Sequence, residues 1–223
     1  MTYFKAAIFD LDVVLADTAR AHYISCKSIS DELGIAFNQS DNEAIKGLDR
    51  AGSLNHILGL GGVSLREPEI AALAAKKNEY YLTQIAEMGP GNLLPGAARL
   101  IDRARKAGLP CAVASASRNA ERLLTQLGIM ELFDYIADAG SIAHPKPAPD
   151  IFLACSSALC VTPDQAVAFE DSAAGISAIR SAGMFAVGIG DPGTLAEANI
   201  VYPSTAAVDF EALFAHRSGF TQD

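Results

Sequence analysis

The second half of the chain alternates short apolar runs with helical patterns, and this alternation limits the possible folds more than any other feature. Runs typical of strands lie at 110–114, 135–137, 166–169 and 186–189. The helical patterns between them often end at a glycine that can cap a helix, as at Gly108, Gly128 and Gly183. The alternation predicts an α/β fold with a doubly wound, Rossmann-like parallel-sheet core whose helices cover both faces.

Residues 16–90 lack a convincing strand run, and their apolar positions recur at spacings of three and four. This pattern predicts helices over 18–33, 41–48, 52–58 and 68–88. Because another apolar run, 6–9, precedes this block, the helices form an insertion in the sheet. We expect a core domain of 1–15 and 92–223 and an inserted all-helical cap domain of 16–91. The hinges should lie near Leu15–Ala16 and in Gly89–Gly91, where glycine and proline interrupt regular structure.

The composition favours a soluble molecule as the substrate. The 223 residues are half hydrophobic, which is enough for a sizeable buried core. Seventeen basic and 26 acidic residues give a net charge of −9, which disfavours binding to nucleic acid or anionic membranes. No apolar run approaches the roughly 20 residues that span a bilayer, and no signal-peptide pattern is visible. We expect a cytoplasmic monomer that binds neither nucleic acid nor membranes.

Polar side chains follow three of the predicted strands. Asp10 and Asp12 end the first apolar run, and in an extended segment their side chains share one face about 7 Å apart. Ser115 follows the next strand, and Glu170 and Asp171 follow the strand at 166–169. Since ligands of doubly wound sheets bind at the carboxyl ends of the strands, these oxygens should meet at one edge.

A cluster of carboxylates at one edge is predicted to hold a cation. Hard oxygen ligands suit Mg²⁺, whereas the four cysteines show no spacing typical of a zinc site. Lys146 lies in a turn-rich stretch and can bring a second positive charge. A carboxylate nucleophile, Mg²⁺, a lysine and a hydroxyl are the groups that phosphoryl transfer needs. Phospho-receiver domains use similar groups, but they are usually about half as long and lack a helical insertion.

Taken together, the motifs resemble those of the haloacid dehalogenase-like hydrolase superfamily, in order and along nearly the whole chain. They are Phe9–Asp12 with Asp17–Thr18, Ser115–Ser117, Lys146–Pro147 and Glu170–Ile176. The helical insertion resembles the cap of that superfamily. His22 and the stretches 46–53, 77–78 and 115–119 are more similar to its sugar phosphomutases than to a general phosphatase.

The resemblance implies a role for each matching residue. Asp10 would be the nucleophile, Asp12 the general acid and base, and Ser115 and Lys146 would hold the phosphoryl group. The predicted Mg²⁺ ligands are Asp10, the backbone carbonyl of Asp12, Glu170 and Asp171. The predicted substrate-binding residues are Thr18, His22, Lys46, Gly47, Arg50, Lys77, Ala116, Ser117 and Asn119. Among these, Arg50, Ser117 and Asn119 would grip the distal phosphate.

Several of these residues also have a purely structural interpretation. His22 can be a half-buried helix residue, Thr18 can cap the helix that follows it, and Ser172 can cap the helix after 172. Arg50 and Lys77 can be solvated surface charges, as Arg118 is expected to be. Their joint fit to one pattern favours the functional interpretation.

Val13 departs from the superfamily pattern, which usually has glycine directly after the second aspartate. Valine strongly disfavours positive φ, so a turn built for glycine would be strained or rerouted here, whereas a negative φ would cost little. We hypothesise that Val13 leaves metal binding intact but restricts the loop that carries Asp12.

The function implied by the resemblance is that of a Mg²⁺-dependent sugar phosphomutase. It would interconvert β-glucose 1-phosphate and glucose 6-phosphate through an aspartyl-phosphate enzyme and a bisphosphate intermediate. One alternative is a phosphatase that hydrolyses a small sugar phosphate with the same nucleophile. Another is a binding or regulatory protein whose turnover is impaired by Val13, although both aspartates, Lys146 and the acidic pair at 170–171 are retained.

Overall fold

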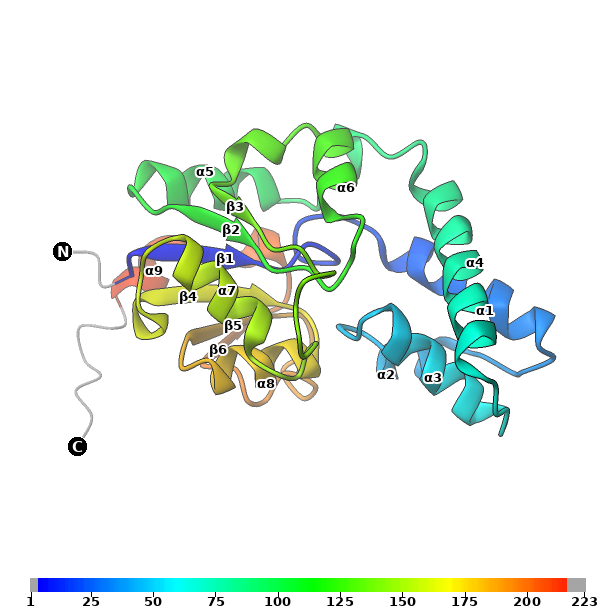
Figure 1. The fold of residues 1–223 in the computed structure, drawn as a ribbon. Helices are drawn as coiled ribbons and strands as arrows, with labels where there is room; N and C mark the ends of the chain where they lie inside the picture. The colour runs from blue at the N-terminus through cyan, green and yellow to red at the C-terminus, as the bar shows by residue number, and fades with distance from the viewer. Residues whose placement is uncertain (1–3, 216–223) are drawn as a thin grey trace.

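A parallel β-sheet forms the centre of the molecule in the computed structural model, which describes residues 4–215 (Figure 1). Within that range the sheet has six strands in the order β3-β2-β1-β4-β5-β6, and every neighbouring pair is parallel. The strands are β1 (Ala6–Phe9), β2 (Cys111–Val113), β3 (Tyr135–Ile136), β4 (Ala166–Glu170), β5 (Phe185–Ile189) and β6 (Ile200–Tyr202). The doubly wound fold is therefore confirmed, and only β6 was not predicted.

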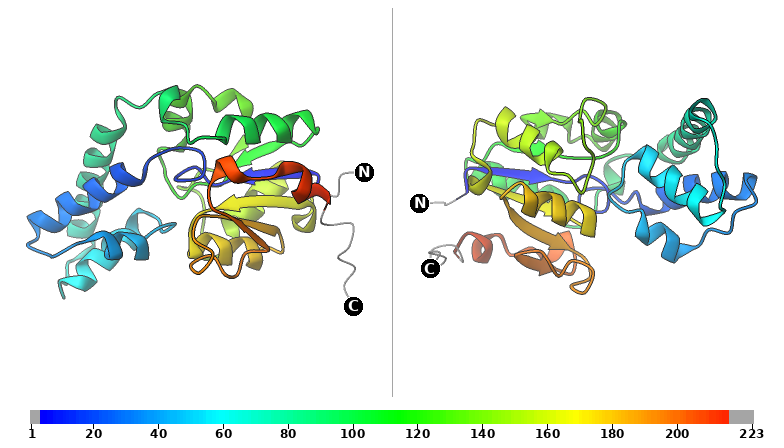
Figure 2. Two further views of the ribbon diagram at one scale, coloured as in Figure 1. Left: turned by 180° about the vertical axis from the view of Figure 1, so that it is seen from behind. Right: turned by 60° about the horizontal axis from the view of Figure 1, so that its bottom comes forward.

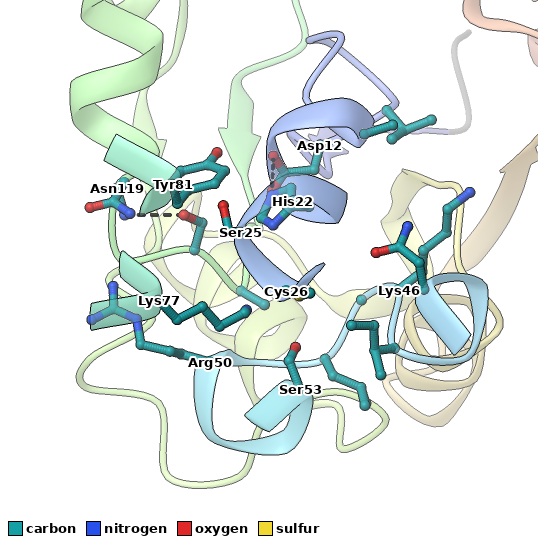
Figure 3. Close-up of a pocket in the computed structure, with 18 of the residues that line it drawn as sticks. Asp12, His22, Ser25, Cys26, Lys46, Arg50, Ser53, Lys77, Tyr81 and Asn119 are labelled. Carbon is teal, nitrogen blue, oxygen red and sulfur yellow. Dashed lines mark hydrogen bonds and ion pairs between the residues drawn. The ribbon is translucent and has the colours of Figure 1, made fainter. Parts of the chain in front are cut away.

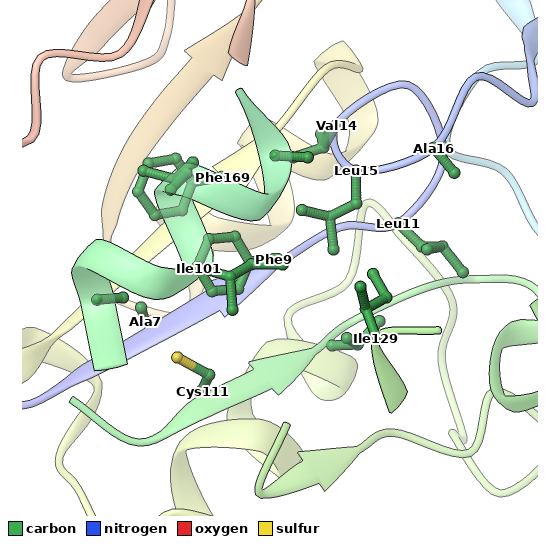
Figure 4. Close-up of a cluster of buried hydrophobic side chains, with 14 of the residues drawn as sticks. Ala7, Phe9, Leu11, Val14, Leu15, Ala16, Ile101, Cys111, Ile129 and Phe169 are labelled. Carbon is green, nitrogen blue, oxygen red and sulfur yellow. The ribbon is translucent and has the colours of Figure 1, made fainter. Parts of the chain in front are cut away.

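Both faces of this sheet are covered, which explains why its strands are apolar without alternation. Ala7 and Phe9 of β1 face one hydrophobic cluster, in which Phe9 stacks on Phe169 with ring centroids 5.0 Å apart (Figure 4). Ala6 and Ile8 face a second cluster on the opposite side. The helices of the core are α5 (Ala97–Lys106), α6 (Ala120–Leu127), α7 (Asp150–Ala158), α8 (Ala173–Ser181) and α9 (Phe210–Ala215).

The chain between β1 and α5 forms a separate group of helices beyond the carboxyl ends of the strands (Figures 1 and 2). These helices are α1 (Ala19–Glu32), α2 (Gln39–Ala44), α3 (Arg50–Leu60) and α4 (Glu67–Ile85). The long helices α1 and α4 pack side by side, and Ile29, Leu54 and Leu58 form one of the small cores of the group. No helix within residues 4–215 is long and apolar enough to cross a membrane.

Two helices of this group begin earlier than predicted because a side chain caps each one. The Asn38 side chain accepts a hydrogen bond from the Ser40 backbone and starts α2 at Gln39 rather than residue 41. In α3, the Asp49 side chain accepts from the Gly52 backbone at 2.8 Å. Arg50 is therefore the first residue of a helix, two positions before the predicted start.

The two connections between the sheet and the helical group lie next to each other. Ala16 forms isolated bridges with Asp12 and Leu93, and the backbone N–H of Leu94 donates to the Leu15 carbonyl at 2.9 Å. Outgoing and returning chain are thus joined by main-chain hydrogen bonds. A short 3₁₀ turn, η1 (Pro90–Asn92), precedes the return to the core.

Candidate active site

The carboxyl end of β1 carries a buried ion-pair cluster. Asp10 follows β1 directly, and its neighbour β4 ends at Glu170. The Lys146 ammonium donates to Asp10 Oδ1 at 2.6 Å and to Glu170 Oε2 at 2.8 Å. All three residues are at most 5% exposed, so solvent screens these interactions little. The structure thus brings together residues that are up to 160 positions apart in sequence.

This cluster has more negative than positive charge. The pKa of Asp10 is raised to about 8, because burial and the Glu170 carboxylate, which both raise it, outweigh Lys146, which lowers it. Burial also raises the pKa of Asp171 well above its ordinary value, with added repulsion from Glu170 and Asp10. Burial disfavours the charged form of Lys146, but Asp10 and Glu170 outweigh it and raise the lysine pKa. An additional cation at this position would relieve the repulsion among the carboxylates.

Glu170 is held in place by the start of α8. Its Oε1 accepts from the Ser172 hydroxyl at 2.7 Å and from the backbone N–H groups of Asp171 and Ser172. A Cβ on Gly175 would lie 2.0 Å from Glu170 Cδ, so only glycine allows the carboxylate to approach this turn. Ser172 also accepts from the Gly175 N–H at 3.0 Å, which confirms its predicted role as a helix cap.

The acidic residues fit a hard divalent cation. One carboxylate oxygen from each of Asp10, Glu170 and Asp171 lies within 4.8 Å of the others. Both oxygens of Glu170 already accept hydrogen bonds, whereas Asp171 Oδ2 is buried and forms none within the described part of the chain. It lies 3.8 Å from the Lys46 ammonium of the helical group. An all-oxygen set with one orphaned carboxylate oxygen suits Mg²⁺.

Asp12 is oriented by α1 and the chain just before it. Thr18 Oγ1 donates to Asp12 Oδ1 at 2.7 Å, and His22 Nε2 lies 3.1 Å from the same oxygen. Burial raises the Asp12 pKa, but His22 and Thr18 outweigh it and the net shift is downward. The Thr18 side chain does not cap α1. Its hydroxyl bonds Asp12 instead, so the interpretation of Thr18 as a helix cap is not supported. Ser115 Oγ lies 3.5 Å from Asp12 Oδ2.

The loop after Asp12 adopts the conformation that glycine would favour. Val13 has φ = 62°, and its N–H donates to the Ala16 carbonyl at 2.9 Å. The next carbonyl, that of Val14, accepts from the buried Thr205 hydroxyl at 2.7 Å. A left-handed valine costs on the order of 1–3 kcal/mol and persists only where its surroundings enforce it. Positive φ at Val13 is therefore real strain beside a proposed catalytic residue.

The far end of the site is lined by cations and amides. Arg50 donates to Asn78 Oδ1 at 2.7 Å, and Asn119 Nδ2 donates to the same oxygen at 2.9 Å. Burial lowers the Arg50 pKa, and the nearby Arg118 guanidinium lowers it further. Two nearby guanidinium groups, one of them bonded to a neutral amide oxygen, form an environment that favours an anion.

One pocket connects the two ends (Figure 3). The predicted residues that line it are Asp10, Asp12, His22, Lys46, Gly47, Arg50, Lys77, Ala116, Ser117, Asn119 and Asp171. The other predicted residues are buried behind the lining and are Thr18, Ser115, Lys146 and Glu170. Gly47, with φ = 74°, lies against Ser172, where a Cβ would come within 2.2 Å of the hydroxyl oxygen.

Several polar residues that line the pocket were not predicted as site residues, although Ser53, Asn78 and Arg118 lie in the stretches that resemble sugar phosphomutases. They are Ser25, Cys26, Asn42, Ser53, Asn78, Tyr81 and Arg118. Arg118 is exposed, as expected, but it also borders the pocket. Tyr81 follows Lys77 by four positions in the continuous helix α4. Residues at this spacing share one helix face, so the helical pattern could have identified Tyr81 once Lys77 was chosen.

The sheet, the helical insertion and the aspartate–lysine–carboxylate cluster define the class of protein. The chain belongs to the haloacid dehalogenase-like hydrolase family, whose model matches residues 4–183. It is 41% identical over 211 residues to a β-phosphoglucomutase of Bacillus subtilis (strain 168), covering 94% of this chain and 93% of that protein.

The chain is also similar to a second mutase, known from its crystal structure, and to a phosphatase. The crystal structure of β-phosphoglucomutase from Clostridium difficile matches with a TM-score of 0.91 and 40% identity, over 94% of this chain and 95% of that one. The fructose-1-phosphate phosphatase YqaB of Escherichia coli (strain K12) is 32% identical over 190 residues, covering 83% of this chain and 96% of that protein. The resemblance inferred from the motifs is confirmed.

Proposed function

We propose that this protein is a Mg²⁺-dependent sugar phosphomutase that interconverts β-glucose 1-phosphate and glucose 6-phosphate. The observation that carries the proposal is a single pocket with a nucleophile cluster at one end and an anion-binding group at the other. A bisphosphate intermediate has two phosphates and needs both ends. Similarity to β-phosphoglucomutases along nearly the whole chain supports this substrate.

In the proposed reaction the ionised Asp10 attacks the phosphoryl group and becomes an aspartyl phosphate. Lys146, 2.6 Å from Asp10, neutralises charge on the transferring group, and Ser115 donates to it from the end of β2. Asp12, kept ionised by His22 and Thr18, removes the proton from the accepting sugar hydroxyl and returns it to the leaving oxygen. A trace of glucose 1,6-bisphosphate supplies the first phosphoryl group. The aspartyl phosphate then transfers it to the 6-hydroxyl of β-glucose 1-phosphate, which breaks the bond to Asp10 and gives glucose 1,6-bisphosphate. Asp10 next takes the phosphoryl group from position 1 of this intermediate, and glucose 6-phosphate leaves.

Mg²⁺ would be held by Asp10, Glu170 and Asp171 with the Asp12 backbone carbonyl, and it would neutralise phosphoryl charge during the transfer. Asp171 is the carboxylate with an oxygen left free of hydrogen bonds. At the other end, Arg50, Ser117 and Asn119 would bind the second phosphate. Lys46, Gly47, Lys77 and Ala116 complete the proposed substrate site.

We also propose that residues 16–91 act as a cap domain that moves relative to 1–15 and 92–223. The paired connections at Ala16 and Leu93 would form the hinge. Closure over the pocket would exclude water from the aspartyl phosphate, as a mutase requires. Gly47 against Ser172 and Lys46 beside Asp171 are contacts that closure would use.

Product analysis tests this function. The protein is incubated with β-glucose 1-phosphate, Mg²⁺ and a trace of glucose 1,6-bisphosphate, and products are followed by phosphorus NMR. Glucose 6-phosphate should form much faster than inorganic phosphate. The Asp10→Asn variant should remain folded and lose turnover by at least about 10⁴-fold, because its amide cannot form the acyl phosphate.

A phosphatase for a small sugar phosphate is the second candidate, because similarity extends to a fructose-1-phosphate phosphatase. Release of inorganic phosphate at a rate comparable to isomerisation would favour it. Sugar phosphate binding without any turnover would favour a protein that only binds its ligand.

A further inference from the structure

Tyr81 places a buried hydroxyl in the middle of the pocket without a hydrogen bond. It lies on α4, is 5% exposed, and lines the pocket (Figure 3). Its ring packs with Ala21 and Ile85 between α1 and α4, so its position is well determined. Yet the phenol oxygen is fully buried and has no hydrogen-bond partner among residues 4–215. An unsatisfied buried hydroxyl destabilises the folded state, and phenylalanine would fill the same volume without this cost.

The hydroxyl lies between the two ends of the site. Burial raises the pKa of the Tyr81 phenol well above its ordinary value, and the side chains of Asp12 and Ser117 act on it from nearby, through contacts too long or too bent to be hydrogen bonds. Asp12 belongs to the reaction end and Ser117 to the distal end. In Figure 3 the hydroxyl points away from Arg50 and Lys77. A sugar ring with one phosphate at each end would occupy the space in between.

The ring of Tyr81 also supports the reaction end. It packs against the His22 imidazole, with ring centroids 4.5 Å apart and an interplanar angle of 36°. His22 lies 3.1 Å from Asp12 Oδ1. The aromatic contact limits the imidazole to the position that pairs with Asp12. A phenylalanine ring would keep this packing, so the two roles of Tyr81 can be separated by experiment.

From these observations we infer that Tyr81 is a specificity-determining residue whose hydroxyl forms a hydrogen bond with a hydroxyl of the sugar ring. The inference rests on the proposed function and adds the group that recognises the sugar itself rather than its phosphates. It also explains why the hydroxyl lacks a partner within the protein. The bond forms only when a sugar phosphate is bound, and a phosphate ester without sugar hydroxyls gains nothing from it.

The test compares Tyr81→Phe with the wild type on two substrates. On β-glucose 1-phosphate, kcat/KM should fall about tenfold, the effect of one lost hydrogen bond. Hydrolysis of acetyl phosphate, which has no sugar hydroxyl, should stay within about twofold. The unfolding temperature should be equal or higher, because the variant removes an unsatisfied buried group. Tyr80→Phe is the matched control, because the Tyr80 hydroxyl bonds Glu32 on the exposed side of α4 and all three quantities should hardly change.

Monodeoxy analogues of glucose 6-phosphate distinguish direct contact from an effect through His22. For the analogue that lacks the contacted hydroxyl, wild type and Tyr81→Phe should react at equal rates. An equal loss on every analogue, or on acetyl phosphate, would overturn the inference and leave Tyr81 as a support for His22. Sugar phosphate turnover that is unchanged by Tyr81→Phe would also overturn it.

The same design separates this inference from the proposed function. Should the wild type hydrolyse sugar phosphates without isomerising them, the mutase proposal fails. The Tyr81 comparison is then made on that hydrolysis with the same expectation. A wild type that processes acetyl phosphate but no sugar phosphate would overturn both.

Discussion

The two ends of the pocket are built in different ways. At the reaction end, Asp10 and Glu170 are placed by adjacent strands and joined by Lys146, and all three are buried in the core. At the distal end, Arg50 and Asn78 come from the helical group and are only partly buried. Asn119 reaches them from the core, just before α6. The reacting groups are therefore preorganised within the core. Recognition of the second phosphate depends instead on how the helical group is placed relative to the core.

Replacing Lys146 with methionine should give the largest loss of stability of a change at the reaction end. The variant leaves Asp10 and Glu170 buried without their cation, which should cost about 3–5 kcal/mol of unfolding free energy. Turnover should fall by about 10²–10³-fold, because phosphoryl charge is less neutralised. Denaturant unfolding and steady-state kinetics measure the two losses.

Lys106→Met is the matched control, because its ion pair with Asp102 is exposed on α5. That pair should contribute at most about 1 kcal/mol, with no change in turnover. A Lys146 variant with stability and rate like those of the control would contradict the view that the reaction end is a buried, preorganised cluster.

Replacing Arg50 with alanine tests the distal end and should act on one class of substrate only. We expect kcat/KM for β-glucose 1-phosphate to fall by about 10–100-fold, since a charged hydrogen bond to phosphate is lost. Hydrolysis of acetyl phosphate, which has no second phosphate, should be unaffected. Arg118→Ala, which removes an exposed guanidinium from the rim, should have a smaller effect. An equal loss on both substrates would contradict the division of labour between the two ends.

The reaction end could be predicted from the sequence better than the distal end, because strands place the residues of the first and packed helices those of the second. The apolar runs identify the strands, and the polar residues that follow them must meet at one edge, so Asp10, Ser115 and Glu170 could be found from the residues alone. The distal end depends on how helices pack, which local sequence does not encode. Arg50 was chosen only through the family resemblance, and its partner Asn78 lay in a matching stretch but was given no role.

Magnesium should largely offset the pH dependence of stability at the reaction end. The pKa of Asp10 is raised from 3.8 to about 8, so its contribution to stability is full below about pH 4 and is lost as pH rises through about 8. Without metal, the unfolding temperature should fall between pH 6 and pH 8. The fall should be about 2–4 °C for each kcal/mol of unfolding free energy that is lost. Mg²⁺ at 100 times its Kd should add about 2.7 kcal/mol, and its effect should be larger at pH 8, where about half of Asp10 is already ionised, than at pH 6.

Two variants check this assignment by thermal unfolding. Asp10→Asn should weaken the pH dependence, because one of the two carboxyls with a raised pKa is gone and only Asp171 remains. Asp171→Asn should abolish most of the Mg²⁺ effect, since it removes the carboxylate with an oxygen free of hydrogen bonds. A Mg²⁺ effect of equal size at pH 6 and pH 8 would argue against Asp10 as a ligand.

Replacing Val13 should give the smallest change in stability. This residue also shows that the reaction end contains backbone strain. Val13→Gly removes a left-handed valine that costs about 1–3 kcal/mol, while the glycine loses about 0.5–1 kcal/mol more backbone entropy on folding. We expect a net gain of about 1 kcal/mol in unfolding free energy, or about 2–4 °C. Val13→Ala keeps the Cβ and should gain little.

The turnover rate of Val13→Gly tests whether the strain at Val13 restricts the movement of Asp12. The loop is held in place by the Thr205 hydroxyl and by hydrogen bonds at Leu15 and Ala16, so glycine should keep its average position and leave the Mg²⁺ dependence unchanged. If Val13 restricts the movement of Asp12, the glycine variant should turn over several times faster. Val13→Ala should turn over like the wild type. Equal rates for all three proteins would mean that the strain at Val13 has no part in catalysis, and that Asp12 is positioned by Thr18 and His22 alone.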